Sequence, residues 1–406
     1  STRRDEAQKY FDQGMALVYA FNHEEAVRSF QHAAEVDPGS PMPWWGIALA
    51  LGPNINLDVD PVREKQAWDA VQKAVQLAAR APAKERAYVT ALARRYANDP
   101  KADLKALAVE YKDAMRQLTR TYPNDMHAAT LFAESLMDLH PWALYAADGS
   151  PTEGTAEIVE VLEHVLEREP DHVGANHYYI HATEASLTPE RGMKSAKKLE
   201  TLMPGAGHLV HMPAHTYMRT GNYAGAVQAN AKAADVDRKY IADQNPGGMY
   251  PAMYYNHNLD FLASAAMMTG QYAEALKAAK APVAGNAGLG IGMANSQRAM
   301  LRVPDLAAAW RDFGAANGQS AIGRDILLQV SFAVSMANGC RYCTIHQVVG
   351  LRRIGVDPTK LLAMEKDDAA LTPREKTAVL YARTLTATPW AASEDRKSTR
   401  LNSSHT

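Results

Sequence analysis

The chain holds two cysteines, Cys340 and Cys343, separated by two residues, and His346 follows three positions later. A thiolate is the best nucleophile and redox group that a protein offers near neutral pH. At the start of a helix, free backbone N–H groups and the helix dipole lower the pKa of a thiol, and His346 could exchange its proton. A zinc site is disfavoured, because one Cys-x-x-Cys with so close a histidine is cramped for tetrahedral geometry. The motif predicts dithiol redox chemistry, with two buried structural thiols as the alternative.

Histidines form a second group of reactive side chains, since six of the fourteen lie between His177 and His257. Three helical segments can be aligned on a small residue of each, Gly192, Ala226 and Ala275. In this alignment the histidines fall in pairs at the same repeat positions. These positions lie on one helical face, because steps of three and four residues return to nearly the same angle. The pairs are His177 with His211, His181 with His215, and His208 with His257, and Glu184 extends the first row.

Two histidines four residues apart on a helix can bind one metal ion, and a second pair on the adjacent helix would complete four ligands. Nitrogen-rich ligation with an optional carboxylate suits zinc, copper or iron. Pro213 would kink the second helix or delay its start, which would move His208 and His211 off the row. A polar groove for a peptide or small molecule, and a purely structural role, are the alternatives. The candidate metal ligands are His177, His181, Glu184, His208, His211, His215 and His257.

The elements that carry these side chains are predicted to be helices. Long segments are rich in Ala, Leu, Glu, Lys and Gln, with apolar residues at i, i+3, i+4 and i+7, so we expect an all-α protein. A helix–turn–helix phrase recurs at Phe21–Ala26, Thr220–Ala226 and Thr269–Ala275. Over about residues 5–280 the chain resembles the tetratricopeptide repeat family, whose helical hairpins stack into a superhelix. The resemblance implies a concave groove for a peptide or protein partner, with the imidazoles of neighbouring helices facing it.

Beyond a Gly- and Ala-rich stretch at 285–290 the repeat phrase disappears. Residues 302–389, and most strongly 338–356, resemble the carboxymuconolactone decarboxylase and alkylhydroperoxidase D-like family. That family implies a small helical domain in which Cys343 attacks a hydroperoxide and Cys340 resolves the sulfenic acid as a disulfide, with a thiol reductant as partner. Leu328 and Gln347 stand where the family commonly has glutamate and histidine, so the proton relay is incomplete unless His346 substitutes.

Composition describes an ordinary globular protein: 406 residues, 47% hydrophobic, 22% charged and a formal net charge of -2. Nothing here favours nucleic acid, and the apolar runs are too short to cross a membrane. The chain opens at Ser1 without an initiator methionine, and the dithiol favours a reducing compartment such as the cytoplasm. Residues 395–405 look like a translated sequencing-library adapter. The family implies an oligomer, but helices that it places after residue 389 are missing from this sequence.

The predicted organisation is a repeat array at 1–281, a linker at 282–300, an alkylhydroperoxidase-like domain at 301–390 and a disordered tail at 391–406. We expect a thiol-dependent antioxidant enzyme, an alkylhydroperoxidase-like oxidoreductase with peroxiredoxin-type activity carried on the array. The dithiol needs no cofactor. The alternatives are a metal-dependent site built from the array histidines, or a non-catalytic binding scaffold.

Overall fold

The structure is a computed structural model that describes residues 2–57, 61–146, 148–246 and 250–280, with residues 329, 330, 372, 373, 375, 376 and 379 further along. The chain divides into two compact units, 1–299 and 300–406. Within the described residues the regular structure is helical, and extended segments pair only at the isolated bridges Asn54–Leu57 and Tyr145–Pro151. The all-α prediction is confirmed.

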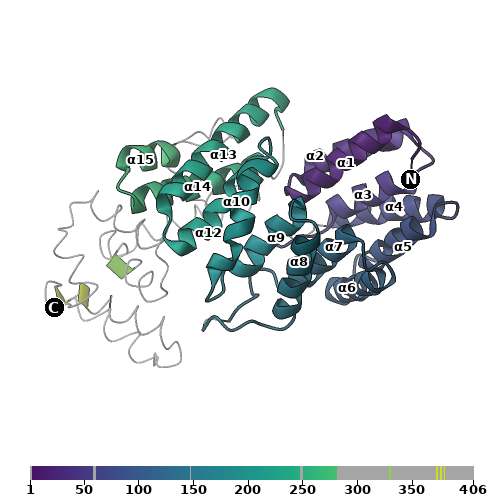
Figure 1. The fold of residues 1–406 in the computed structure, drawn as a ribbon, viewed down its shortest axis with the longest axis horizontal. Helices are drawn as coiled ribbons and strands as arrows, with labels where there is room; N and C mark the ends of the chain where they lie inside the picture. Colours follow the sequence, from purple (N-terminus) through teal and green to yellow (C-terminus); the bar gives the residue numbers. More distant parts are fainter. Residues whose placement is uncertain are drawn as a thin grey trace, which may run out of the picture. The chain divides into compact units, whose positions relative to one another are not determined.

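Unit 1 is a succession of helical hairpins (Figure 1). Four short elements interrupt it: η1 (Ala93–Arg95), η2 (Pro189–Gly192), α11 (Gly207–His211) and the π-helical turn η3 (Tyr250–Tyr254). The paired helices are α1 (Asp5–Tyr19) with α2 (His23–Val36), α3 (Pro41–Leu51) with α4 (Pro61–Ala78), α5 (Ala83–Leu92) with α6 (Leu104–Thr121), α7 (Met126–Met137) with α8 (Thr155–Arg168), α9 (Val173–Glu184) with α10 (Met193–Leu202), α12 (Pro213–Thr220) with α13 (Tyr223–Gln244), and α14 (Tyr255–Met268) with α15 (Tyr272–Lys280).

The recurrent phrase forms the turn of a hairpin, as predicted. Gly221 and Gly270 have φ of +81° and +73°, a left-handed conformation that glycine adopts without steric cost. Asn222 then caps α13, because its side-chain oxygen accepts the N–H of Gly225 at 3.1 Å. In the first hairpin Phe21 takes the left-handed position instead, with φ of +57°.

The segment between the second and third phrases is largely helical, since α13 continues to Gln244 and the π-helical turn η3 begins at Tyr250. Helix-forming residues run through this segment to Asn245, which ends the helix in a left-handed conformation. A long helix therefore takes up part of the spacing between these two phrases.

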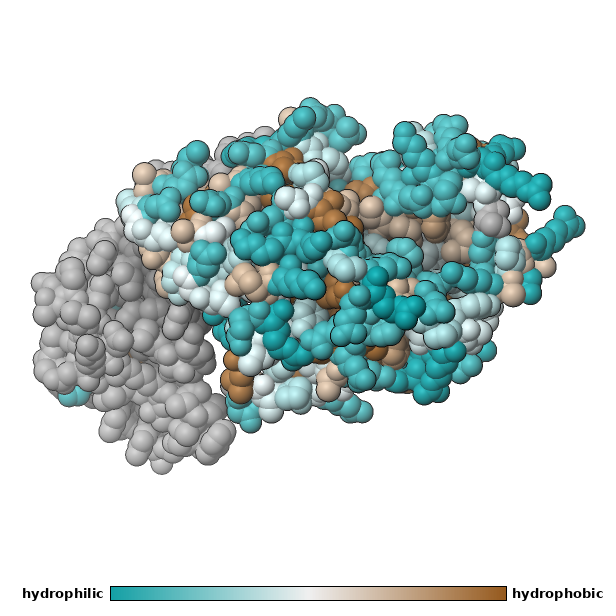
Figure 2. Space-filling view, viewed as in Figure 1, coloured by the Kyte–Doolittle hydropathy of each residue, from teal (hydrophilic) through white to brown (hydrophobic). Residues whose placement is uncertain are grey.

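The core of unit 1 joins distant parts of the chain. Its larger apolar cluster gathers buried side chains from α1 through α9, and Tyr250 and Tyr254 pack into it from far along the sequence. The C-terminal end of α1 contacts α9. Hydrophilic side chains dominate the visible outer face of these helices (Figure 2). None of the helices in the described ranges is both long and apolar enough to cross a bilayer.

In unit 2 the described residues show how one helix begins. Thr372 and Glu375 form a capping box: the Thr372 N–H donates to Glu375 Oε2 at 2.8 Å, and the Glu375 N–H donates to Thr372 Oγ1 at 3.3 Å. Pro373 occupies the first helical position. Gln329 adds a buried hydrogen bond to Glu375 at 2.7 Å, which ties two segments of this unit together.

A candidate metal centre of six histidines

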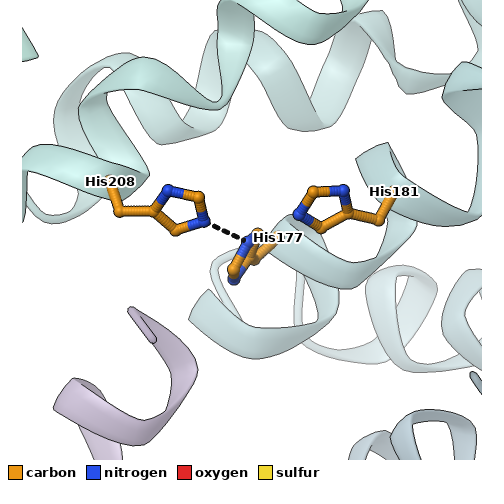
Figure 3. Close-up of side chains that lie close together, drawn as sticks. All are labelled: His177, His181 and His208. Carbon is orange, nitrogen blue, oxygen red and sulfur yellow. Dashed lines mark hydrogen bonds between the residues drawn. The ribbon is translucent and has the colours of Figure 1, made fainter. Parts of the chain in front are cut away.

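The seven side chains that the sequence nominates as ligands lie together in unit 1. They come from four elements, α9, α11, α12 and α14. Figure 3 shows the imidazoles of His177, His181 and His208 turned toward one another. Two groups of three histidines each place one ligand atom per residue within 4.8 Å of the others. The first group, called site A, is His177, His181 and His208; the second, called site B, is His211, His215 and His257.

The two sites follow from the repeat. Each site takes an i, i+4 histidine pair from one hairpin and its third histidine from the next hairpin along the chain. The proline in the second pair does break the helix, since α11 ends at His211 and α12 starts at Pro213. The break does not move His208 and His211 away from the others, because the His215 N–H still bonds the Met212 carbonyl at 3.1 Å in a tight turn.

Two imidazoles are held through Nδ1 by groups that can only accept. His177 Nδ1 lies 2.7 Å from the Tyr19 carbonyl oxygen, so it carries the proton. His211 Nδ1 lies 2.5 Å from Asn230 Oδ1, and the Asn230 amide is oriented by its own donation to the Ala226 carbonyl at 2.7 Å. Neutral imidazole holds one proton, so Nε2 of both rings carries a lone pair. His177 Nε2 accepts a hydrogen bond from His208 Nε2 at 3.2 Å, while His211 Nε2 has no partner among the described residues (Figure 3). Protein metal sites typically orient their histidines in this way.

Glu184 does the same for one histidine of each site. Its Oε1 accepts from His181 Nδ1 at 2.8 Å, and its Oε2 accepts from His215 Nδ1 at 2.5 Å. His181, Glu184 and His215 also place one ligand atom each within 4.8 Å of the others, so Glu184 stays among the candidate ligands. Its two hydrogen bonds orient both imidazoles so that Nε2 of each ring carries the lone pair.

The separations between Nε2 atoms suit shared coordination. His177 Nε2 and His208 Nε2 lie 3.2 Å apart, and His215 Nε2 and His257 Nε2 lie 3.4 Å apart. Two nitrogens bound to one tetrahedral ion at 2.0–2.1 Å are separated by about 3.3 Å. In the described structure, Nε2 of His181 and of His211 are buried without a hydrogen-bond partner. The residues therefore fit a transition-metal ion in each site.

Burial favours the neutral form of five of these imidazoles, His177, His181, His208, His211 and His257. The pKa values of His177, His208 and His211 lie well below the ordinary value, first because burial penalises the cation and then because neighbouring imidazoles repel it. Burial and His215 lower the pKa of His257 to about 3. Burial alone would raise the pKa of Glu184, but His215 and His181 outweigh it and hold that pKa well below its usual range. Neutral imidazole is the form that binds metals.

Two aromatic residues that sequence reasoning missed flank the histidines. The Phe21 ring contacts His177 at 4.5 Å, His208 at 5.5 Å and His181 at 6.2 Å between centroids. The Trp142 ring meets His181 edge-on at 5.7 Å. Both residues have a positive φ, of +57° and +59°, which costs free energy in a non-glycine residue. One sequence carries no signal for such contacts, which join residues 39 to 187 positions apart.

Two cavities lie near the centre. A cavity of about 310 Å³ reaches His181 and Glu184 from the side of Trp142. A larger groove of about 1000 Å³ lies beyond Tyr19 and is lined by His127 and His172. None of the histidines of sites A and B lines this larger groove. All six are buried except His257, which is half-buried. A peptide or protein partner in that groove stays a prediction.

The groove histidines form a pair that was not predicted. His172 Nδ1 accepts the Ala175 N–H at 3.1 Å, so its Nε2 carries the proton and donates to His127 Nδ1 at 3.1 Å. The Tyr19 hydroxyl also lies 3.0 Å from His127 Nδ1. The side chain of Tyr19 thus lines the groove, while the carbonyl oxygen of Tyr19 accepts the Nδ1 proton of His177.

The predicted thiol site, Cys340, Cys343 and His346, lies outside the described residues. No curated protein matches the chain. Residues 304–384 match the family model described as the carboxymuconolactone decarboxylase family. The C-terminal part of this chain is therefore similar in sequence to that family.

Proposed function

We propose that unit 1 binds divalent transition-metal ions, zinc, copper or iron, in sites A and B. One observation carries the proposal: four imidazoles are fixed through Nδ1 and present Nε2 to a shared interior. The tetratricopeptide-like interpretation of the hairpins supports it, since a repeated hairpin supplies the same ligand set twice. Three histidines leave a coordination position for water or substrate, as catalytic sites do. A bound ion would supply Lewis-acid or redox chemistry there.

The direct test is metal content. Protein stripped with a chelator and reloaded with zinc, copper(II) or iron(II) is expected to hold about two equivalents of one of them after gel filtration, measured by mass spectrometry. His177→Ala should remove the ion of site A and His211→Ala the ion of site B, and the double variant should hold none. His164→Ala, an exposed histidine on α8, is the matched control. Metal-free wild-type protein, or equal losses in the control, would contradict the proposal.

A second function is proposed for the C-terminal domain, a thiol peroxidase activity. The match over 304–384 supports it, because this family includes alkylhydroperoxidase-like proteins. In the roles that the resemblance implies, the Cys343 thiolate attacks a hydroperoxide, the O–O bond breaks, and an alcohol leaves as Cys343 becomes a sulfenic acid. Cys340 then displaces water to form a disulfide, which an external dithiol reduces.

Peroxide consumption in the presence of a dithiol reductant tests this second proposal. We expect turnover in the wild type that Cys343→Ser abolishes. In a separate assay without reductant, Cys340→Ser should consume one equivalent of peroxide and stop at the sulfenic acid, whereas the wild type should end as the disulfide. His177→Ala serves as the control, since its effect is expected on metal content and not on peroxide turnover. Wild-type protein that consumes no peroxide would exclude this function.

A further inference from the structure

The cavity of about 310 Å³ beside site A is not needed to bind a metal. It is lined by residues of four segments that are distant in sequence, including His181 and Glu184 of the candidate metal centre. Its volume is at the lower end of the range for small-molecule pockets and far above that of one water molecule. It therefore has room for a compact organic molecule next to the ligands of site A.

One wall of the cavity is apolar and aromatic. Ile55, Met137 and Leu144 are buried and line it. Trp142 lines it as well, with 62% of its surface exposed and its ring edge-on to His181 at 5.7 Å. A large aromatic side chain kept exposed and in a left-handed backbone conformation is costly, and such residues concentrate at functional sites. This wall fits a flat apolar ligand.

The other side of the cavity offers a positive charge. Arg219 Nε donates to the Glu184 carbonyl at 2.8 Å, and Nη2 lies 3.5 Å from the Ser186 carbonyl, so the guanidinium is oriented by backbone groups. Within the part of the chain that the structure describes, Arg219 makes no ion pair. Glu184 also lines the cavity, but both of its carboxylate oxygens accept imidazole N–H groups. A guanidinium oriented in this way is a receptor for a carboxylate.

We propose that this cavity is the substrate site of the metal centre and binds a small aromatic carboxylate. The ring packs against Trp142 and the apolar wall, and the carboxylate pairs with Arg219. This inference rests on the proposed metal binding, because the ion in site A is what the bound molecule would meet at His181. It assigns to unit 1 a class of substrate, planar organic monoanions, that is unrelated to peroxides.

Cobalt-loaded protein gives a direct test, with benzoate as the probe and benzyl alcohol as its uncharged counterpart. Cobalt(II) bound to histidines absorbs visible light, and a molecule binding beside it changes that spectrum. We expect benzoate to shift the cobalt bands and to bind at least tenfold more tightly than benzyl alcohol. Arg219→Gln should weaken benzoate binding about tenfold or more and leave benzyl alcohol unaffected.

The control variant is Arg191→Gln, since Arg191 is an arginine of the same unit that pairs with Glu163 away from the cavity. It should bind benzoate as the wild type does. Equal affinity for benzoate and benzyl alcohol in the wild type, or unchanged benzoate binding in Arg219→Gln, would overturn the inference. Absence of a cobalt spectrum would instead refute the proposed metal site, so the two failures are distinguishable.

Discussion

The carbonyl oxygen of Tyr19 accepts the Nδ1 proton of His177 at 2.7 Å, across 158 positions of sequence. The first hairpin of unit 1 therefore orients a histidine of site A although it contributes no candidate ligand itself. Phe21, two residues later, packs against three imidazoles of the cluster. The turn after α1 is thus part of the surroundings of the candidate metal centre.

This contact predicts that Phe21→Ala weakens metal binding as well as stability. Removing a ring that is 2% exposed should cost about 3–5 kcal/mol of unfolding free energy, because the cavity left behind is filled poorly. Metal affinity should also fall about tenfold, since His177 and His181 lose their packing. Phe30→Ala, equally buried between the first helices, is the control. It should destabilise similarly in urea titrations and leave metal affinity unchanged; a similar loss of affinity in both variants would contradict the prediction.

Glu184→Gln should weaken both sites at once. An amide has one accepting oxygen, so it can hold His181 or His215 in the metal-binding tautomer but not both. Loss of such a positioning group typically costs about 10–100-fold in metal affinity. Competition titrations with a chromophoric chelator would measure it. Glu163→Gln makes the same change in a carboxylate that accepts from Tyr179 and Arg191 outside the cluster, and should bind metal normally.

Gly207→Ala is predicted to disrupt the start of α11. A methyl group there would lie 1.8 Å from Asp237 Oδ1, and that carboxylate is held by Tyr250 at 2.9 Å and Asn258 at 2.7 Å. We expect a loss of about 3 kcal/mol of unfolding free energy, because the buried carboxylate has no room to move. Gly205→Ala, two residues earlier, meets nothing within 4 Å and should change stability by less than about 0.5 kcal/mol. Equal denaturation midpoints for the two variants would refute this.

Asp237 predicts a pH dependence of stability. Burial raises its pKa to about 7, although the hydrogen bonds from Tyr250 and Asn258 act in the opposite direction. At this carboxyl the folded protein binds a proton that the unfolded chain has lost between about pH 4 and pH 7, so the contribution of Asp237 to stability falls as pH rises through that window. The buried histidines with lowered pKa values act in the opposite direction, so the contribution is measured as the difference between the wild type and Asp237→Asn. In urea unfolding of chelator-treated protein, the unfolding free energy of the wild type relative to Asp237→Asn should fall by about 2–4 kcal/mol across the window, and a constant difference would contradict the prediction.

The sequence predicts the helices and the row of histidines because both depend on short-range periodicity. Steps of three and four residues, and the recurrence of His177 and His211 at one repeat position, are local patterns. What orients those side chains is not local. Tyr19 and Trp142 reach the centre only through packing between hairpins, and Asn230 reaches it from the middle of α13. The positive φ of Phe21 carries none of the usual glycine signal. The second hydrogen bond of Glu184, to His215 on another helix, is likewise not visible in a local pattern.

The stepwise construction of the two sites has a consequence for how they assemble during synthesis. Site A becomes complete once His208 has left the ribosome, while site B waits for His257. The turn that carries Phe21 is synthesised long before His208 or His257, and domains form from the N-terminus as the chain emerges. If the sites bind metal as proposed, a nascent chain could take up an ion in site A while the residues of site B are still being translated. Site A would then be occupied before site B.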